Sequence, residues 1–170
     1  MGSILGSLCL QLHPTKTRLV ELGLGKDGFE FLGCYLRIVR SRFKGRCYLF
    51  RWPSQRAMKA IRSRIHDLTA RRRWAGMKDI REVIRVLNPV LRGWGGYFRT
   101  GNASAKFNQI DHYVRDRLLR LMERKGGQRR WRPDGRPFRR ADWPHRRFVT
   151  DHGLYQLLGT IRYPGGAHAG

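Results

Sequence analysis

The chain is predicted to be an α+β protein in which a small N-terminal antiparallel β-sheet is followed by an α-helical bundle and a basic, largely irregular C-terminal tail. Three observations lead to this prediction. Strand-forming residues and turn formers alternate up to Pro53, apolar residues then recur every three to four positions, and glycine, proline and arginine crowd the chain beyond Lys125. The expected domain boundaries are therefore 1–53, 54–125 and 126–170.

The N-terminal region contains three runs that favour β-strands, namely Thr17–Leu22, Phe29–Ile38 and Cys47–Trp52. The glycine-rich segment 23–28 separates the first two, and Lys44–Gly45 precedes the third. A three-stranded sheet of this size is too small to be a stable domain by itself.

Two helices are predicted between Ser54 and Leu87. Ser54 suits the N-cap of the first, because its hydroxyl can accept a hydrogen bond from a free N–H of the first turn. The apolar stripe of this helix consists of Ala57, Ile61, Ile65 and Leu68. The second helix carries apolar residues at i, i+3, i+4 and i+7, which are Ile80, Val83, Ile84 and Leu87.

A third, short helix is predicted from Asn88 to Phe98. Asn88 can cap it, and Pro89 suits its first turn because proline has no N–H to leave unpaired there. Trp94, Tyr97 and Phe98 are assigned to the core rather than to base stacking. Glycines weaken a helix by about 1 kcal/mol each relative to alanine. Gly93, Gly95 and Gly96 therefore suggest the close approach of a neighbouring helix or an RNA backbone, with an ordinary short core helix as the alternative.

The fourth and longest helix is predicted from Ser104 to Lys125. Its inward residues are Phe107, Ile110, Val114, Leu118, Leu121 and Met122, and its outward face carries the pairs Asp111–Arg115 and Asp116–Arg120. The four helices are expected to pack as a bundle.

Beyond the helices, residues 128–140 alternate arginines with aromatic residues. Such a run can become ordered on RNA, and a solvated linker is the alternative. Trp131, Phe138 and Trp143 are predicted to lie outside the bundle, where they could stack on bases.

The net charge of +24, from 36 Lys and Arg against 12 Asp and Glu, points to a polyanionic partner. Residues 1–36 are neutral overall, so the whole excess lies in residues 37–170. Arginine predominates, and its planar guanidinium suits phosphates and bases better than a membrane surface. The apolar segment Ile4–Leu12 is too short to span a bilayer. Three widely spaced cysteines argue against a disulfide framework and a zinc knuckle, which indicates a reducing, cytoplasmic setting.

The predicted RNA contacts are basic residues on the helices, with one aromatic residue in the tail. They are Arg56, Lys59, Arg62, Arg71, Arg72 and Arg73 on the first helix and its exit, Arg92 and Arg99 beside the third, Arg115, Arg117, Arg120 and Arg124 on the fourth, and Trp131.

Four stretches in a characteristic order cover nearly the whole chain: Leu12-His13-Pro14-Thr15-Lys16-Thr17-Arg18, Gly28-Phe29-Glu30-Phe31-Leu32-Gly33, Leu87 to Phe98, and His152-Gly153-Leu154-Tyr155 with Gly159-Thr160-Ile161-Arg162-Tyr163-Pro164. Together they resemble the proteins encoded by bacterial group II introns, which are reverse transcriptases and RNA-splicing maturases. The resemblance implies a C-terminal piece of such a protein. It would hold the end of the polymerase palm, with primer-grip-like residues Lys16, Phe31, Leu32 and Gly33, followed by the thumb, also called the maturase-specific or X domain.

A reverse transcriptase needs clustered aspartates that bind two Mg²⁺ ions. The eight aspartates of this chain include no adjacent pair. We therefore expect no catalytic residues, no metal site and no cofactor, with Mg²⁺ required only in full-length relatives.

The resulting hypothesis is an RNA-binding maturase or thumb module without polymerase catalysis. Its partner would be group II intron RNA, whose folding and splicing it assists, or a template–primer RNA/DNA duplex that it holds. One alternative is the thumb subunit of a split reverse transcriptase with a separately encoded palm, and another is a structural RNA-binding protein. A His-Asn-His nuclease is disfavoured, because His145, His152 and His168 lack paired cysteines and are expected on the surface.

Overall fold

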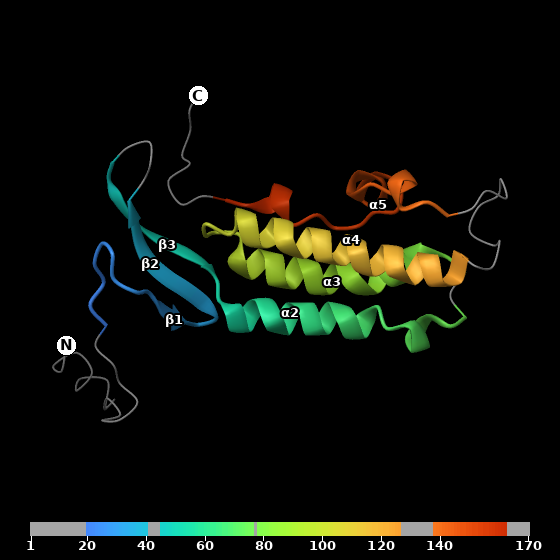
Figure 1. The fold of residues 1–170 in the computed structure, drawn as a ribbon, viewed down its shortest axis with the longest axis horizontal. Coiled ribbons are helices and arrows are strands. Elements are labelled where there is room, and N and C mark those ends of the chain that lie inside the picture. The colour runs from blue at the N-terminus through green and yellow to red at the C-terminus, as the bar shows by residue number, and fades with distance from the viewer. Residues whose placement is uncertain (1–19, 41–44, 77, 127–137, 163–170) are drawn as a thin grey trace.

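The structure is a computed structural model that describes residues 20–40, 45–76, 78–126 and 138–162, without the side chains of 124–126. A β-sheet lies at one end, three long helices extend from it, and the C-terminal segment returns along them (Figure 1). The predicted α+β class is confirmed. Within the described ranges, we find no helix with the length and apolarity needed to cross a membrane.

The sheet consists of β1 (Phe29–Phe31), β2 (Cys34–Arg40) and β3 (Cys47–Pro53), antiparallel in the order β1-β2-β3. The prediction of one strand over Phe29–Ile38 was wrong. Leu32 and Gly33 have positive φ angles of 47° and 73°, and this pair closes a tight hairpin between β1 and β2. The predicted strand at Thr17–Leu22 was also wrong where it can be compared, because residues 20–22 are not a strand. Its first three residues lie outside the described part of the chain.

Helix α2 (Gln55–Leu68) follows β3 directly, and its prediction is confirmed. The N-cap hydroxyl of Ser54 accepts a hydrogen bond from the N–H of Ala57 at 3.3 Å. Met58, Ile61, Ile65 and Leu68 are buried, whereas Ala57 of the predicted stripe is half-buried. A 3₁₀ turn, η1 (Arg71–Trp74), comes shortly after the helix.

Helix α3 (Ile80–Phe98) is continuous, so the division into two helices at Asn88 was wrong. Asp79 forms the N-terminal capping box with Glu82, and Pro89 lies inside the helix on its exposed side. A proline there removes one helical hydrogen bond at a cost of about 3 kcal/mol. The cost is tolerated because the buried residues Ile80, Val83, Ile84, Leu87, Leu91, Gly95 and Phe98 form one unbroken stripe on both sides of the proline.

Helix α4 (Ser104–Gly126) buries all six residues that were predicted to face inward. The predicted outward position of Asp111 was wrong, because this carboxylate is 4% exposed. The bundle therefore consists of the three long helices α2, α3 and α4 rather than four.

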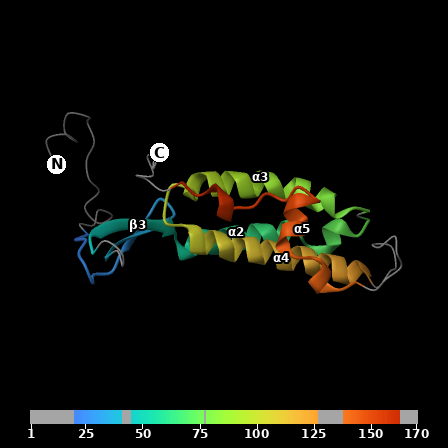
Figure 2. The same cartoon turned by 90° about the horizontal axis from the view of Figure 1, so that it is seen from above.

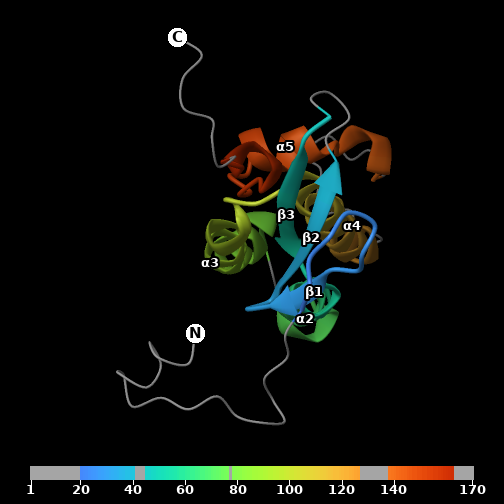
Figure 3. The same cartoon turned by 90° about the vertical axis from the view of Figure 1, so that its left-hand side faces the viewer.

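The C-terminal segment contains η3 (Arg140–Asp142), α5 (His145–Thr150) and η4 (Leu158–Thr160). It lies across α3 and α4, on the side opposite α2 (Figures 2 and 3). Its buried residues Trp143, Phe148, Leu154 and Leu157 belong to the same core as the bundle. Trp143 is 6% exposed, so its predicted position outside the bundle was wrong. Trp131 lies outside the described residues.

Candidate nucleic-acid interface

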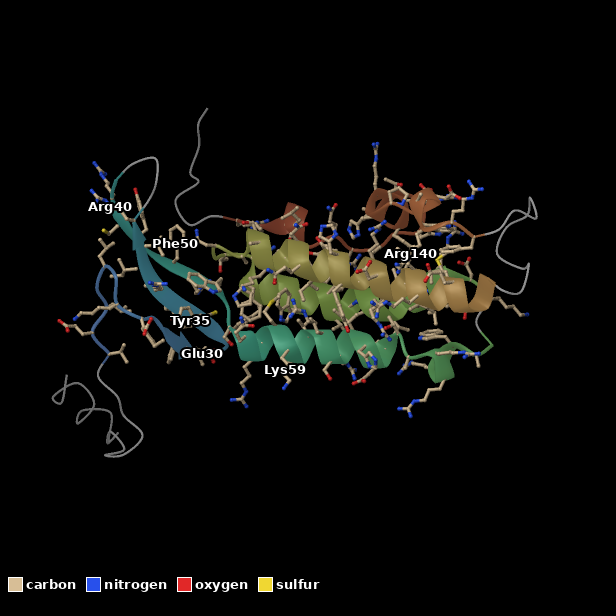
Figure 4. All side chains as sticks on the ribbon, viewed as in Figure 1. Glu30, Tyr35, Arg40, Phe50, Lys59 and Arg140 are labelled. Carbon is tan, nitrogen blue, oxygen red and sulfur yellow. The ribbon has the colours of Figure 1, made fainter. Side chains whose placement is uncertain are left out.

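The basic residues predicted to bind RNA are not neutralised by carboxylates, as far as the described side chains show. Ion pairs of lysine or arginine with carboxylates involve Lys26, Arg81, Arg140 and Arg147, none of which is a predicted contact. Figure 4 shows Arg140 at the α4 side, where it pairs with Glu123 at 2.8 Å. The predicted contacts that are exposed are Arg56, Lys59, Arg71, Arg72, Arg73, Arg92 and Arg120. The side chain of Arg124 is not described.

The outer face of α2 presents two cations to solvent. Arg56 and Lys59 are exposed, and Lys59 projects from the face turned away from α3 and α4 (Figure 4). Arg62 is half-buried and donates a hydrogen bond to Oε1 of Gln109 at 3.4 Å. The first two side chains are therefore available for phosphate contacts, whereas Arg62 links α2 to α4.

The η1 turn presents three consecutive exposed arginines, Arg71 to Arg73. Trp74 fixes this turn, because its indole N–H donates to the carbonyl of Leu68 at 2.6 Å. The guanidinium of Arg73 also lies 5.9 Å from the centroid of the Trp74 ring. The turn is therefore anchored to α2, and its three positive charges lie at the C-terminal end of that helix.

Arg117 and Arg115 on α4 have structural partners. Nε of Arg117 donates to the hydroxyl of Thr69 at 2.8 Å, and its Nη2 donates to the carbonyls of His66 and Thr69, each at 3.3 Å. A cation at a helix C-terminus is favoured by the helix dipole. Nε of Arg115 donates to the carbonyl of Trp143 at 3.3 Å, which holds the C-terminal segment on α4.

The glycines of α3 differ in their surroundings. A Cβ on Gly95 would lie 2.6 Å from Cδ2 of Leu157, so this glycine allows the close approach of the C-terminal segment. Added Cβ atoms on Gly93 and Gly96 would meet nothing within 4 Å, counted over described residues. Arg92 is exposed next to Gly93, with its guanidinium 5.5 Å from the ring of Tyr155. The exposed face of α3 therefore combines the guanidinium of Arg92 with the uncovered backbone of Gly93 and Gly96.

Arg99 is half-buried at the end of α3, where its carbonyl accepts a hydrogen bond from the N–H of Arg162 at 2.7 Å. The assignment of Tyr97 to the core was wrong, because its side chain is 55% exposed. Its hydroxyl donates to the carbonyl of Leu32 at 2.8 Å. Phe98 is buried and Trp94 is half-buried, as expected of core residues.

The β1–β2 hairpin carries the primer-grip-like residues Phe31, Leu32 and Gly33. Phe31 is 59% exposed and Leu32 is 69% exposed. Ser54 donates its N–H to the carbonyl of Gly33 at 2.9 Å, so both α2 and α3 hold the turn. An open hollow of about 430 Å³ separates these residues from Arg56 and Ala60 of α2. The remaining predicted residue, Lys16, lies outside the described residues.

The two described histidines of the predicted tail are half-buried and not ordinary exposed surface residues, which corrects the sequence interpretation. The ring nitrogens of His145 and His152 are buried without a hydrogen-bond partner within the described part of the chain. Burial lowers the pKa of both imidazoles below the ordinary value for histidine. No group of three or more His, Cys, Asp or Glu residues suited to a metal ion occurs in the described ranges. His168 is not among them.

Three residues support this surface in ways that the sequence analysis did not predict: the buried Thr69, the half-buried Trp74 and the solvent-facing Tyr97. Thr69 directly follows the last apolar residue of α2, which is a recognisable position for a helix end. Trp74 ends an arginine run and its partner is six residues earlier, so a local search could have found it. Tyr97 contacts a strand turn 65 residues away, and no local pattern indicates this.

Comparison with protein families relates the middle of the chain to a described domain. Residues 58–136 match the family model described as group II intron, maturase-specific domain. The match includes α3, α4 and most of α2. No curated protein matches the chain.

Proposed function

We propose that the arginine-rich outer faces of the helices bind intron RNA and assist the folding and splicing of that RNA. The proposal builds on the match of the chain to the maturase-specific domain of group II intron proteins. The family match points to a maturase-related role in splicing. The direct contact with RNA through named side chains is our proposal.

One observation carries this proposal above the others. The exposed arginines among the predicted contacts have no carboxylate partner in the described part of the molecule; they are Arg56, Arg71, Arg72, Arg73, Arg92 and Arg120. An arginine that forms no internal ion pair keeps its guanidinium free to replace a counterion on a phosphate. The net charge of +24 then attracts a polyanion to the surface of the chain.

The proposed role requires no bond to be made or broken by this chain. We expect no primer extension by the isolated chain on any template with Mg²⁺, because no adjacent aspartate pair occurs in its sequence. Incorporation of nucleotide that persists after repeated purification would contradict this expectation.

The binding experiment is a filter-binding titration of the full chain against a folded group II intron RNA over a range of salt concentrations. If six to ten phosphates are contacted, affinity should fall roughly a thousandfold or more between about 50 and 200 mM salt. An unrelated structured RNA of equal length serves as the control for specificity. A salt-independent affinity, or no binding at low salt, would refute the proposed function.

A second candidate is the thumb subunit of a split reverse transcriptase, which would act with a separately encoded palm. The exposed apolar side chains of the sheet favour it: Phe31, Leu32, Tyr48 and Leu49 are all more than 40% exposed. The test is to co-express the chain with the fingers and palm of a group II intron reverse transcriptase. Primer extension that appears only when both chains are present would support this candidate.

A further inference from the structure

A small recess lies where the C-terminal end of α2 meets η1 and α4. It is lined by Thr69, Arg71, Arg117, Arg120 and Leu121, and its volume is about 60 Å³. A water molecule needs roughly 10–15 Å³ on this scale, so the recess admits the oxygens of a small anionic group. Three of its five lining residues are arginines, which come from two separate elements.

The recess is built on fixed contacts. Thr69 is 2% exposed and its hydroxyl donates to the carbonyl of Ile65 at 2.7 Å, which leaves its oxygen to accept from Nε of Arg117. Nη2 of Arg117 is engaged by two carbonyls, and no hydrogen bond to a described residue engages its Nη1. The guanidinium of Arg117 is therefore held in one orientation with donors left over.

The other two arginines of the recess are not engaged by the described part of the structure. Arg71 and Arg120 are exposed and take part in no hydrogen bond or ion pair with a described residue. Arg71 is positioned by η1, which the indole of Trp74 anchors to α2. The recess thus joins one fixed guanidinium to two that are free to move toward a ligand.

The charges at this place favour an anion. No carboxylate lines the recess. The carbonyls at the end of α2 would repel an anion, but Arg117 covers two of them. Arg72 and Arg73 are exposed on the same turn, so positive charge continues beyond the recess. An extended chain of phosphates matches this arrangement better than a single protein carboxylate does.

We propose that this recess receives one backbone phosphate of the bound RNA, held by the guanidiniums of Arg71, Arg117 and Arg120. The inference rests on the proposed function and refines it, because it places a single phosphate at the α2–η1–α4 junction. Guanidinium donors pair with phosphate oxygens in a defined geometry. The recess then fixes the register of the RNA on the bundle. The other exposed arginines attract the RNA electrostatically but do not determine where along the bundle it binds.

The test uses the full chain with Arg71→Ala, Arg120→Ala and the double variant, and with Arg85→Ala as a matched control. Arg85 is exposed on α3 and lines none of the recess, so its loss removes one positive charge elsewhere. Arg117 is left intact because it holds the end of α2. Each single recess variant should bind intron RNA roughly tenfold more weakly, with a salt slope lower by about one.

The double variant should weaken binding by less than the product of the single effects, because both side chains hold the same phosphate. Arg71→Lys and Arg120→Lys keep the charge but lose the planar fork, so they should recover the salt slope and only part of the affinity. Recess variants that behave like Arg85→Ala would overturn the proposal, even with tight RNA binding by the wild type.

A second measurement does not depend on RNA. Inorganic phosphate is titrated into the chain with ¹⁵N-labelled arginine, and the Nε–H signal of Arg117 is followed. A saturable shift in the wild type that is lost in the double variant supports the recess. A shift that never saturates overturns it. If the chain binds inorganic phosphate saturably but does not bind RNA, the proposed function is refuted. The recess would then be an anion site whose ligand is not RNA.

Discussion

At the scale of single residues, two polar side chains hold the C-terminal segment on the bundle. Asn88 donates from Nδ2 to the carbonyl of Gly153 and accepts from the N–H of Tyr155, both at 2.8 Å. The carboxylate of Asp111 accepts the N–H groups of Leu157 and Leu158, each at 3.0 Å. From the sequence, Asn88 was predicted to be a helix cap and Asp111 an outward-facing acid. Both predictions were wrong because the hydrogen-bond partners of these residues lie 46 to 67 residues away, where no local sequence pattern indicates them.

Replacement of Asp111 by alanine should lower the free energy of unfolding by about 2 kcal/mol, because two backbone N–H groups would lose their acceptor. Asp116→Ala is the matched control, since Asp116 is exposed on the same helix. It should change stability by no more than about 0.5 kcal/mol. Urea denaturation measures both variants, and equal effects would contradict the role assigned to Asp111.

His152 should make the fold sensitive to acid. Its pKa is lowered first by burial and then by the charge of Arg81, against the opposing effects of Asp79 and Asp151. The unfolded chain therefore binds a proton more readily than the folded chain. Stability is fully present above the ordinary histidine pKa of about 6.5 and is lost as the pH falls through that value toward the lower folded pKa.

The matched variant is His152→Phe, which keeps a ring beside Trp143, whose centroid lies 5.3 Å from that of the imidazole. The free energy of unfolding is measured with urea at about pH 7.5 and 5.5. The loss of stability on acidification should be smaller in the variant than in the wild type. An identical loss would show that His152 does not titrate in this interval.

At the scale of elements, apolar spacing was a reliable guide to which residues are buried and a poor guide to where elements end. Three of the four stripe residues predicted for α2 and all six predicted for α4 are buried, because each stripe is a single run with period 3.6. In α2 the half-buried Ala57 was predicted instead of the buried Met58. The local signal of Asn88 and Pro89 suggested a new helix, but tertiary burial of the continuous α3 stripe outweighed it. The hairpin at Leu32 was missed because leucine seldom adopts a positive φ.

The three glycines of α3 offer a matched set of variants. Gly95→Ala should lower the free energy of unfolding by about 1–3 kcal/mol, because the new methyl group would overlap the fully buried Leu157. Gly93→Ala and Gly96→Ala should raise it by up to about 1 kcal/mol each, since alanine favours the helix and meets no neighbour.

The same variants test the close approach of an RNA backbone to α3. If RNA lies against this face, Gly93→Ala and Gly96→Ala should bind intron RNA more weakly although they are more stable. Thermal or urea unfolding and filter binding on the same preparations give both quantities. Unchanged affinity in both variants would remove α3 from the RNA surface.

At the scale of the whole molecule, the arginines serve two purposes that composition alone does not separate. The net charge and its absence from residues 1–36 indicated a polyanionic partner. In the structure, Arg115 holds the C-terminal segment on α4 through the carbonyl of Trp143, and Arg147 donates to the carbonyl of Asp142 within that segment. Arg56, Arg71 and Arg120 have no described partner. This division depends on contacts between distant segments, so the sequence predicted the chemistry of the surface but not which cations belong to it.

The most direct test of the RNA-binding surface compares two triple variants that lose the same charge. Arg56, Arg71 and Arg120 are replaced by alanine in the first, and Arg115, Arg140 and Arg147 in the second. The salt slope of intron RNA binding and the free energy of unfolding are measured for both. The first should lose about two units of slope with its stability retained, one for the phosphate at Arg56 and one for the phosphate that Arg71 and Arg120 share. The second should keep most of the slope while losing about 1–3 kcal/mol of stability. Equal slopes in the two variants would mean that binding follows net charge alone, and the assignment of a specific RNA surface would be wrong.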